Sequence, residues 1–203
     1  LTLTLAALAV VLAASITYTV RSPRFAVRSV TITGALKNAD PRFLESIVRK
    51  EFRGTYFTLN LEQARTALAR APWVKSVTVR RQWPRALQVQ IMEHDALARW
   101  NGHELMSTEG IVFSGATDRA LPQLRGPKGS EKEVFEKYSH ASQALARIPM
   151  KLTAMTLSPS FSLSAQVEGN IALEFGHEQF EARLNRLVEN AAQINSRTPV
   201  SVL

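Results

Sequence analysis

The sequence lacks cysteine, has few aromatic residues and carries no long block of like charge. Among its 203 residues there is no Cys, which excludes disulfide frameworks and thiolate metal sites. This absence permits an oxidising compartment without assigning one. Aromatic residues make up 7% of the chain and charged residues 21%, but hydrophobic residues reach 45%, enough for folded cores. The length suits one or two modest domains.

Positive charge is in excess but scattered. The formal net charge is +8, yet no run of Lys and Arg is longer than two residues. Scattered charge is typical of a solvated surface, whereas a nucleic-acid interface gathers it on one face. We therefore expect no nucleic-acid partner.

The first twenty residues contain no charged residue, Pro or Gly, and Arg21 follows them. About twenty apolar residues in a helix match the hydrocarbon core of a bilayer. A signal peptide would have a shorter apolar core, with Ala13-Ala14-Ser15 as a weak cleavage site, and a buried helix would show a polar face. We therefore expect residues 1–20 to span a membrane once. The expected lipid-facing residues include Leu5, Leu8, Val11, Leu12 and Ile16.

The stretch from Ala71 to Trp100 predicts a β-hairpin. Apolar and polar residues alternate over Val77–Arg80 and again over Leu87–Ile91, which is the period of a strand with one buried face. Trp83-Pro84-Arg85 lies between them, and Pro belongs in the turn because it cannot donate a ladder hydrogen bond. The residues expected to point inward are Val77, Val79, Leu87, Val89 and Ile91.

One strand and two helices precede this hairpin. Ala26–Thr33 alternates in character and ends at Gly34. Asp40-Pro41 predicts a helix start, and Asn60 with Gln63 resembles a capping box before a second, short amphipathic helix. The order strand, helix, helix, strand, strand predicts a compact domain over residues 25–95, in which two helices cover one face of a three-stranded sheet. Residues 21–24 would form a linker.

Residues 96–203 predict a second domain of mixed α/β type. Ser130 and Glu133 resemble a capping box for a helix that Pro149 ends, and a further helical stripe runs from Phe180 to Ile194. Strands are expected at Leu152–Leu157, Phe161–Val167, Ile171–Phe175 and Val200–Leu203. The end of the sequence interrupts the last of these. The predicted fold class is therefore α+β, with an antiparallel-rich sheet in the second domain.

No group of residues predicts a chemical site. The histidines are far apart and share no ligand spacing with carboxylates; they are His94, His103, His140 and His177. His94-Asp95 follows a strand, and we expect this pair to face solvent. The glycines are isolated turn residues rather than a phosphate loop. We therefore expect no enzyme activity, no cofactor or metal and no small-molecule substrate.

Three tryptophans lie near predicted strand ends: Trp73, Trp83 and Trp100. Burial of the large ring is the expected structural role of each. An exposed Trp beside Arg80, Arg81 and Arg85 would instead anchor a partner. These arginines could equally be solvated or lie near anionic lipid headgroups.

Several short motifs support a family assignment. They are WVKSVTVRRQWP at Trp73–Pro84, ALARW at Ala96–Trp100, EGIVF at Glu109–Phe113, LPQL at Leu121–Leu124 and GPKGS at Gly126–Ser130. In this order, after a single apolar span, they resemble the FtsQ/DivIB family of bacterial cell-division proteins, whose first extracytoplasmic domain is a POTRA domain. The resemblance covers nearly the whole chain, and members of the family continue with further strand residues past the last predicted strand.

The resemblance implies a non-enzymatic scaffold of the divisome. It implies one pass through the bacterial inner membrane, the bulk of the chain in the periplasm and a location at the division septum. The implied partners are FtsB, FtsL, FtsK, FtsW and FtsI, through which the protein would help control septal peptidoglycan synthesis. Late sheet edges and the basic hairpin would serve these contacts. The expected partner-binding residues are Arg80, Arg81, Phe161, Leu163, Val200, Ser201, Val202 and Leu203.

Two other functions remain open at this point. A POTRA-type chaperone or translocation subunit would pass unfolded β-segments to an outer-membrane barrel, but a single N-terminal anchor weakens this interpretation. A nucleic-acid or cell-wall binder would rest on the net charge alone. Proteins captured from crosslinked membranes would distinguish the three functions.

Overall fold

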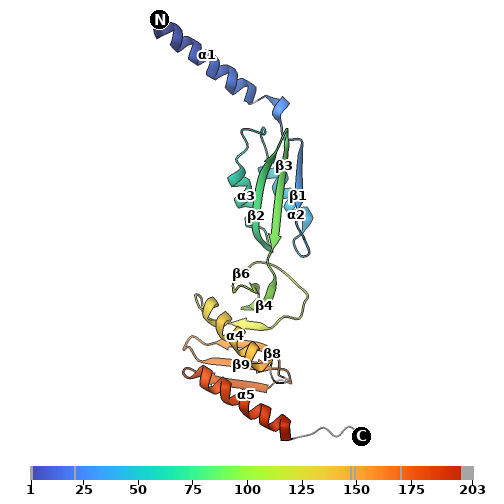
Figure 1. Ribbon diagram of the computed structural model, residues 1–203, viewed down its shortest axis with the longest axis vertical. Helices are drawn as coiled ribbons and strands as arrows, with labels where there is room; N and C mark the ends of the chain where they lie inside the picture. The colour runs from blue at the N-terminus through green and yellow to red at the C-terminus, as the bar shows by residue number, and fades with distance from the viewer. Residues whose placement is uncertain (1, 21, 147, 149, 170, 198–203) are drawn as a thin grey trace, which may run out of the picture. The chain divides into compact units, whose positions relative to one another are not determined.

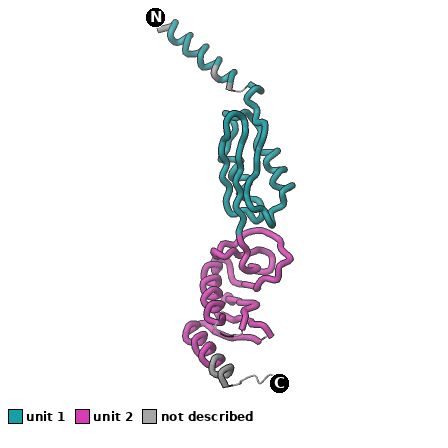
Figure 2. Tube along the Cα trace, turned by 45° about the vertical axis from the view of Figure 1, so that its right-hand side comes forward, with its two compact units in different colours: residues 1–94 teal, residues 95–203 magenta. Residues whose placement is uncertain are grey.

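The computed structural model describes residues 2–20, 22–146, 148, 150–169 and 171–197. The chain forms two compact units, Leu1–His94 and Asp95–Leu203 (Figure 2).

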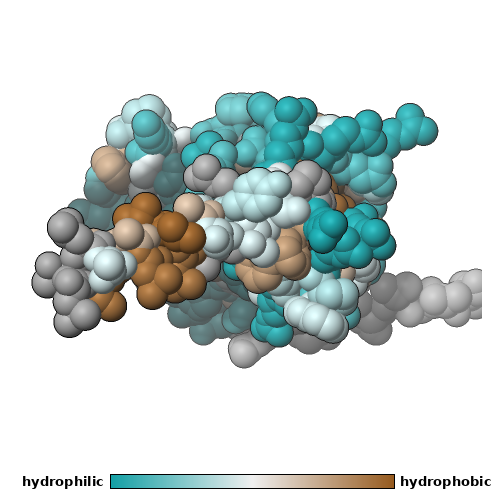
Figure 3. Space-filling model, turned by 90° about the horizontal axis from the view of Figure 1, so that it is seen from above, coloured by the Kyte–Doolittle hydropathy of each residue, from teal (hydrophilic) through white to brown (hydrophobic). Residues whose placement is uncertain are grey.

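Unit 1 begins with helix α1, Thr2–Val20 (Figure 1). Its exposed large apolar side chains form the brown patch in Figure 3 and include Leu5, Leu8, Val10, Val11 and Leu12. The hydroxyls of Ser15 and Thr19 donate to carbonyl oxygens four residues earlier, at 2.8 and 2.7 Å, so these polar groups are satisfied within the helix. Across the residues that the structure describes, no helix combines enough length with enough apolar character to cross a membrane.

The rest of unit 1 contains a three-stranded sheet and two helices in its described part, as the sequence predicts. In the strand order β1-β3-β2, β1 runs parallel to β3 and β2 runs antiparallel to it. A short 3-10 helix, η1 (Pro23–Phe25), leads into this domain. The elements are β1 (Ser29–Thr33), α2 (Pro41–Glu51), α3 (Leu61–Ala69), β2 (Val74–Gln82) and β3 (Ala86–Glu93).

The central strand β3 shows why this sheet forms. Leu87, Val89 and Ile91 are almost completely buried, while Gln88 and Gln90 between them are exposed. Burial of each such apolar side chain contributes about 1.5–3 kcal/mol. On the neighbouring strand Val77 is buried as predicted, but Val79 is only half-buried. The helices supply buried residues to the same domain, among them Leu44, Ala64 and Leu68.

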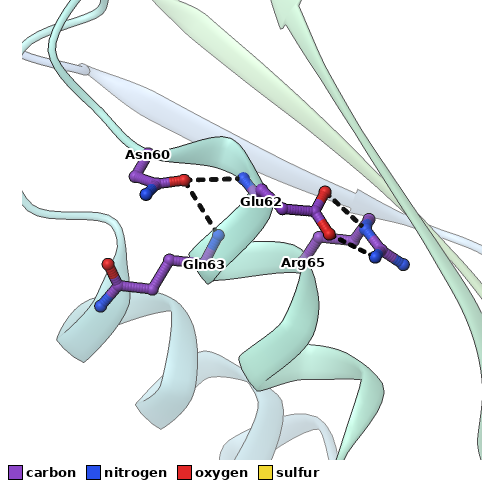
Figure 4. A network of polar contacts seen from close by, with 4 residues as sticks. All are labelled: Asn60, Glu62, Gln63 and Arg65. Atoms are coloured by element: carbon purple, nitrogen blue, oxygen red, sulfur yellow. Dashed lines mark hydrogen bonds and ion pairs between the residues drawn. The ribbon is translucent and has the colours of Figure 1, made fainter.

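Both helices of this domain have side-chain caps at their N-termini. Asp40 accepts a hydrogen bond from the backbone N–H of Arg42 at 2.9 Å. Asn60 accepts from the N–H groups of Glu62 and Gln63 at 3.1 and 3.0 Å (Figure 4). The predicted capping box is only half present, because the Gln63 amide donates to Glu51 at the end of α2 instead, at 3.2 Å. This hydrogen bond therefore links α3 to α2.

Unit 2 is built on one sheet, whose described strands follow the order β10-β9-β8-β7-β4-β5-β6. Most neighbours are antiparallel, but β7 is parallel to both β4 and β8. The elements are β4 (Ala96–Trp100), β5 (Glu104–Ser107), β6 (Val112–Phe113), β7 (Gln123–Arg125), α4 (Glu131–Leu145), β8 (Leu152–Leu157), β9 (Leu163–Val167), β10 (Ile171–Gly176) and α5 (Phe180–Arg197). The fold of each unit is thus mixed α and β, as the sequence predicts.

The core of unit 2 lies between its sheet and its two described helices. Helix α4 packs on β8 and α5 on β10, and the helices contact each other, so they cover the same face of the sheet. Buried residues recur along α4 at spacings of four and three: Val134, Tyr138, Ala141 and Leu145. They join buried residues of the strands, including Met155, Leu163 and Ala165, and Leu184 of α5 in one cluster.

Two predictions about polar side chains are wrong. His94 does not face solvent: it is buried, and its backbone N–H donates to the carbonyl of Trp73 at 2.9 Å, where β3 closes against the start of β2. Ser130 does not cap α4, because its hydroxyl donates to the carbonyl of Pro127 at 2.7 Å. Glu131 accepts from the N–H of Gly129 at 3.1 Å and stabilises the same turn.

The boundaries of two predicted strands also differ. Strand β1 begins at Ser29, because Ala26 makes an isolated bridge to Thr55 instead of joining the sheet. Strand β9 begins at Leu163, because Phe161 has a φ of 59° and so lies in a turn. The predicted strand Val200–Leu203 lies outside the described residues.

Candidate interaction surfaces

Strand β10 forms one edge of the sheet in unit 2, as far as the described residues show. It pairs with β9 from Ile171 opposite Val167 to Glu174 opposite Ser164 and, after a shift in register, through Gly176 opposite Leu163. Near its end the buried ring of Phe175 packs edge-on against Phe180 of α5, with ring centroids 5.0 Å apart. The strand is therefore held on one side by β9 and on one face by α5. Its outer backbone groups provide a template on which another strand can pair.

The opposite edge of this sheet is much shorter. Strand β6 consists of two residues, whereas β10 has six. Short edge strands are a common protection against unwanted pairing. Among the described strands, β10 is therefore the better candidate for strand addition.

The predicted partner-binding residues near this edge are placed differently from one another. Leu163 is 1% exposed on β9, between β8 and β10, so its side chain belongs to the core. Phe161 is 51% exposed in the turn before β9. The remaining four lie outside the described residues: Val200, Ser201, Val202 and Leu203.

The two arginines predicted to bind a partner on β2 have different surroundings. Arg80 is exposed. The guanidinium of Arg81 donates to the carbonyl of Tyr56 at 2.7 Å and to that of Leu59 at 2.9 Å, and it lies 5.9 Å from the centre of the Tyr56 ring. Arg81 therefore fastens the turn before α3 to the sheet, while Arg80 is available at the surface.

The three tryptophans also differ. Trp73 and Trp100 are 3% and 2% exposed, which confirms the structural role expected for each of them. Trp83 is 83% exposed in the turn between β2 and β3, so the burial expected for this residue is wrong. The sequence alone did not distinguish the exposed tryptophan from the buried ones, because each lies near a strand end.

The described histidines do not assemble into a chemical site. His140 pairs with Glu181 at 2.9 Å, and His103 lies 3.8 Å from Glu104. Each pair is separate, and among the described residues no group of three or more His, Asp or Glu could hold a metal ion.

A groove of about 300 Å³ lies on the sheet face of unit 2, lined by side chains that include Gln123, Arg125, Thr156, Ser164 and Gln166.

Comparison with known families covers both units of the chain. The pattern described as "POTRA domain, FtsQ-type" matches residues 25–94, and "Cell division protein FtsQ/DivIB, C-terminal" matches residues 98–202. The chain belongs to the FtsQ/DivIB family of cell division proteins. The family resemblance expected from the sequence motifs is thereby confirmed, as is the POTRA domain within it.

Individual FtsQ proteins align with most of the chain. FtsQ of Burkholderia pseudomallei is 32% identical over 197 residues, which cover 94% of this chain and 79% of that protein. FtsQ of Coxiella burnetii is 33% identical over 164 residues, or 79% of this chain and 68% of that protein. FtsQ of Escherichia coli is 35% identical over 176 residues, or 82% of this chain and 62% of that protein.

Proposed function

We propose that this FtsQ-family chain is a non-enzymatic scaffold of the divisome. It would link FtsK, FtsB and FtsL to the septal wall synthases FtsW and FtsI through protein contacts. The observation that carries the proposal is that one chain matches both the FtsQ-type POTRA domain and the FtsQ/DivIB C-terminal domain. The same pair of matches favours division over outer-membrane chaperone activity.

Rescue of cells depleted of their own FtsQ tests this function. The protein should restore septa and normal cell length. A variant with substitutions at all four histidines should do the same: His94→Gln, His103→Ala, His140→Ala and His177→Ala. Glutamine is used at position 94 because the side chain there is buried. Loss of rescue by a variant that still folds and reaches the septum would indicate a chemical role and contradict the proposal.

We propose further that residues 1–20 anchor the protein in the inner membrane and that the bulk of the chain after them lies in the periplasm. Support comes from the absence of charge in this stretch and from the helix over Thr2–Val20. A charged residue at the centre of a span costs about 2.5–3.5 kcal/mol on insertion. Val11→Arg should therefore reduce the membrane fraction of the protein, whereas Ser22→Arg, beyond the helix, should not. Equal membrane retention of both variants would contradict the anchor.

The third part of the proposal concerns FtsB. Its periplasmic segment would add a strand directly on the outer edge of β10 in unit 2. Long edge strands favour addition through backbone hydrogen bonds, with side-chain pockets supplying specificity. The exposed residues Ile171, Ala172 and Glu174 would be near this contact.

Two neighbouring proline substitutions test the edge. N–H groups of adjacent residues point to opposite sides of a strand, so one of Ala172→Pro and Leu173→Pro removes an inner donor to β9 and the other an outer donor. The variant that keeps the wild-type melting temperature is the outer one. In calorimetry with the periplasmic segment of FtsB, it should bind at least tenfold more weakly than wild type. Unchanged affinity would contradict docking at β10.

A further inference from the structure

One end of the POTRA domain gathers several arginines and exposed aromatic rings. We call the set Arg24, Phe25, Arg28, Phe57, Trp83 and Arg85 the arginine tip. It includes the β2–β3 turn and the segment that enters the domain after α1 (Figure 1).

Hydrogen bonds join the parts of the arginine tip. The Arg85 guanidinium donates to the carbonyl of Arg24 at 2.7 Å, and the backbone N–H of Arg28 donates to the carbonyl of Arg85 at 3.0 Å. The N–H of Tyr56 donates to the carbonyl of Phe25 at 2.7 Å. The entering segment and the β2–β3 turn are therefore fixed to each other.

The aromatic members of the arginine tip lie at its surface. Trp83 is 83% exposed and Phe57 is 52% exposed. Phe57 packs edge-on against Phe25, with ring centroids 5.3 Å apart. Rings that are apolar yet tolerate water on one side are typical of the interface between a bilayer and water.

The segments that carry these rings contain basic residues and no acidic ones. The three segments that supply the arginine tip are residues 21–39, 52–61 and 70–92, and none of them contains Asp or Glu. Arg24 and Arg28 are exposed, and Arg85 is half-buried. A cluster of this kind attracts anionic lipid headgroups.

The short connection between α1 and the arginine tip favours a lipid surface over a distant partner. Arg24 is four residues after Val20, the last residue of α1. An extended chain spans at most about 3.6 Å per residue. The Arg24 carbonyl, which accepts the hydrogen bond from Arg85, therefore lies within roughly 14 Å of the end of α1. The N–H of Ser22 donates to the carbonyl of Thr19, and that of Phe25 to Ser22, which shortens the connection further.

We propose that the arginine tip rests on the headgroup layer of an anionic bilayer, with Trp83 and Phe57 at the interface and the arginines on lipid phosphates. This inference rests on the proposed anchoring of residues 1–20. Contact at the arginine tip adds a second attachment point, which restricts rotation of the POTRA domain about its connection to α1. Partners would then meet the domain in a fixed orientation.

The fluorescence of Trp83 tests the contact. The full-length protein is incorporated into vesicles of phosphatidylethanolamine and phosphatidylglycerol, into vesicles of phosphatidylcholine and into uncharged detergent micelles. The difference between wild type and Trp83→Phe isolates the signal of Trp83. Acrylamide, an uncharged quencher, then reports how far water reaches the ring. We expect quenching in the anionic vesicles to be about threefold weaker than in micelles, with a smaller change in phosphatidylcholine.

Two matched double substitutions test the charge. Arg24→Gln with Arg28→Gln removes two exposed charges from the arginine tip, and Lys37→Gln with Arg42→Gln removes two near the opposite end of the domain. The described hydrogen bonds of all four residues use backbone groups, so neither change removes one. The first double variant should restore quenching in anionic vesicles, and the second should leave the protection intact.

Flotation of the vesicles separates failure of this inference from failure of the anchor. Protein that does not float with any vesicle overturns the anchor and the inference together. Protein that floats while Trp83 stays as accessible as in micelles overturns the inference alone. Equal protection in both kinds of vesicle, unchanged by the arginine substitutions, would contradict the role given to anionic headgroups.

Discussion

The carboxylate of Glu93 accepts hydrogen bonds from both the backbone N–H and the side-chain amide of Asn38, at 3.1 and 3.0 Å. It also accepts from the N–H groups of Lys37 and Ala39, each at 3.0 Å. The last residue of β3 thus holds the loop between β1 and α2. Successive N–H groups that converge on a carboxylate form a small anion-binding nest.

Glu93→Gln should weaken this loop. The amide keeps one acceptor oxygen but loses the charge that strengthens each hydrogen bond. We expect a loss of about 1 kcal/mol in the free energy of unfolding, since the group is partly exposed and water screens part of the interaction. Urea unfolding of the full chain, followed by a probe in the POTRA domain, measures it. As the control, Glu62→Gln on the surface of α3 should hardly move the midpoint; equal effects would contradict a special role for Glu93.

The same loop should depend on pH. Partial burial acts to raise the pKa of the Glu93 carboxyl, but the hydrogen bonds from Ala39, Asn38 and Lys37 outweigh it and hold the pKa below its ordinary 4.5. A carboxyl with a lowered pKa in the folded state stabilises the fold above its unfolded-state pKa, and this contribution is lost as pH falls through the folded-state pKa. The stability difference between wild type and Glu93→Gln should therefore be constant above about pH 5.5 and shrink below it. A difference that grows with acid would contradict this sign.

Substitutions at two neighbouring residues test which face of β3 is buried. Val89 is fully buried in the central strand, whereas Gln88 is exposed. Val89→Asp places an unpaired carboxylate in the core and should cost several kcal/mol, about 3 or more. Gln88→Asp should be mild. Thermal melts that ranked the two variants the other way round would show that the strand faces are assigned wrongly.

Alanine substitutions at Arg80 and Arg81 should differ in their effect on stability. Arg81→Ala removes donors to the carbonyls of Tyr56 and Leu59, so it should destabilise the turn before α3 by about 1–3 kcal/mol. Arg80→Ala should leave stability nearly unchanged. Hydrogen exchange at residues 55–59 measures the first effect, and faster exchange in Arg80→Ala than in Arg81→Ala would contradict the assignment.

Most of the fold followed from the sequence because its signals are local. Alternation over Leu87–Ile91 predicted a strand with one buried face, and the spacing of Val134, Tyr138, Ala141 and Leu145 predicted the buried face of α4. Asn60 capped α3 as expected because that interaction needs only residues two and three positions away.

The rest depends on contacts between distant residues. Gln63 forms its hydrogen bond with Glu51, and Glu93 reaches a loop more than fifty residues away, so neither role is visible in a short pattern. Leu163 and Arg81 were expected at a binding surface. Leu163 instead lies on β9, which pairs with a strand on each side, and Arg81 donates a hydrogen bond to the carbonyl of Tyr56. The candidate edge at β10 follows from strand order, which the sequence did not provide.

In-cell photocrosslinking tests most directly whether this protein is a division scaffold that acts through its sheet edge. A photoreactive residue replaces Ala172 on β10 in the full-length protein, and the control replaces Lys132, which is exposed on α4. We predict a covalent adduct with FtsB from position 172 and none from position 132. Absence of FtsB at position 172, or capture of outer-membrane barrel precursors there, would contradict the account.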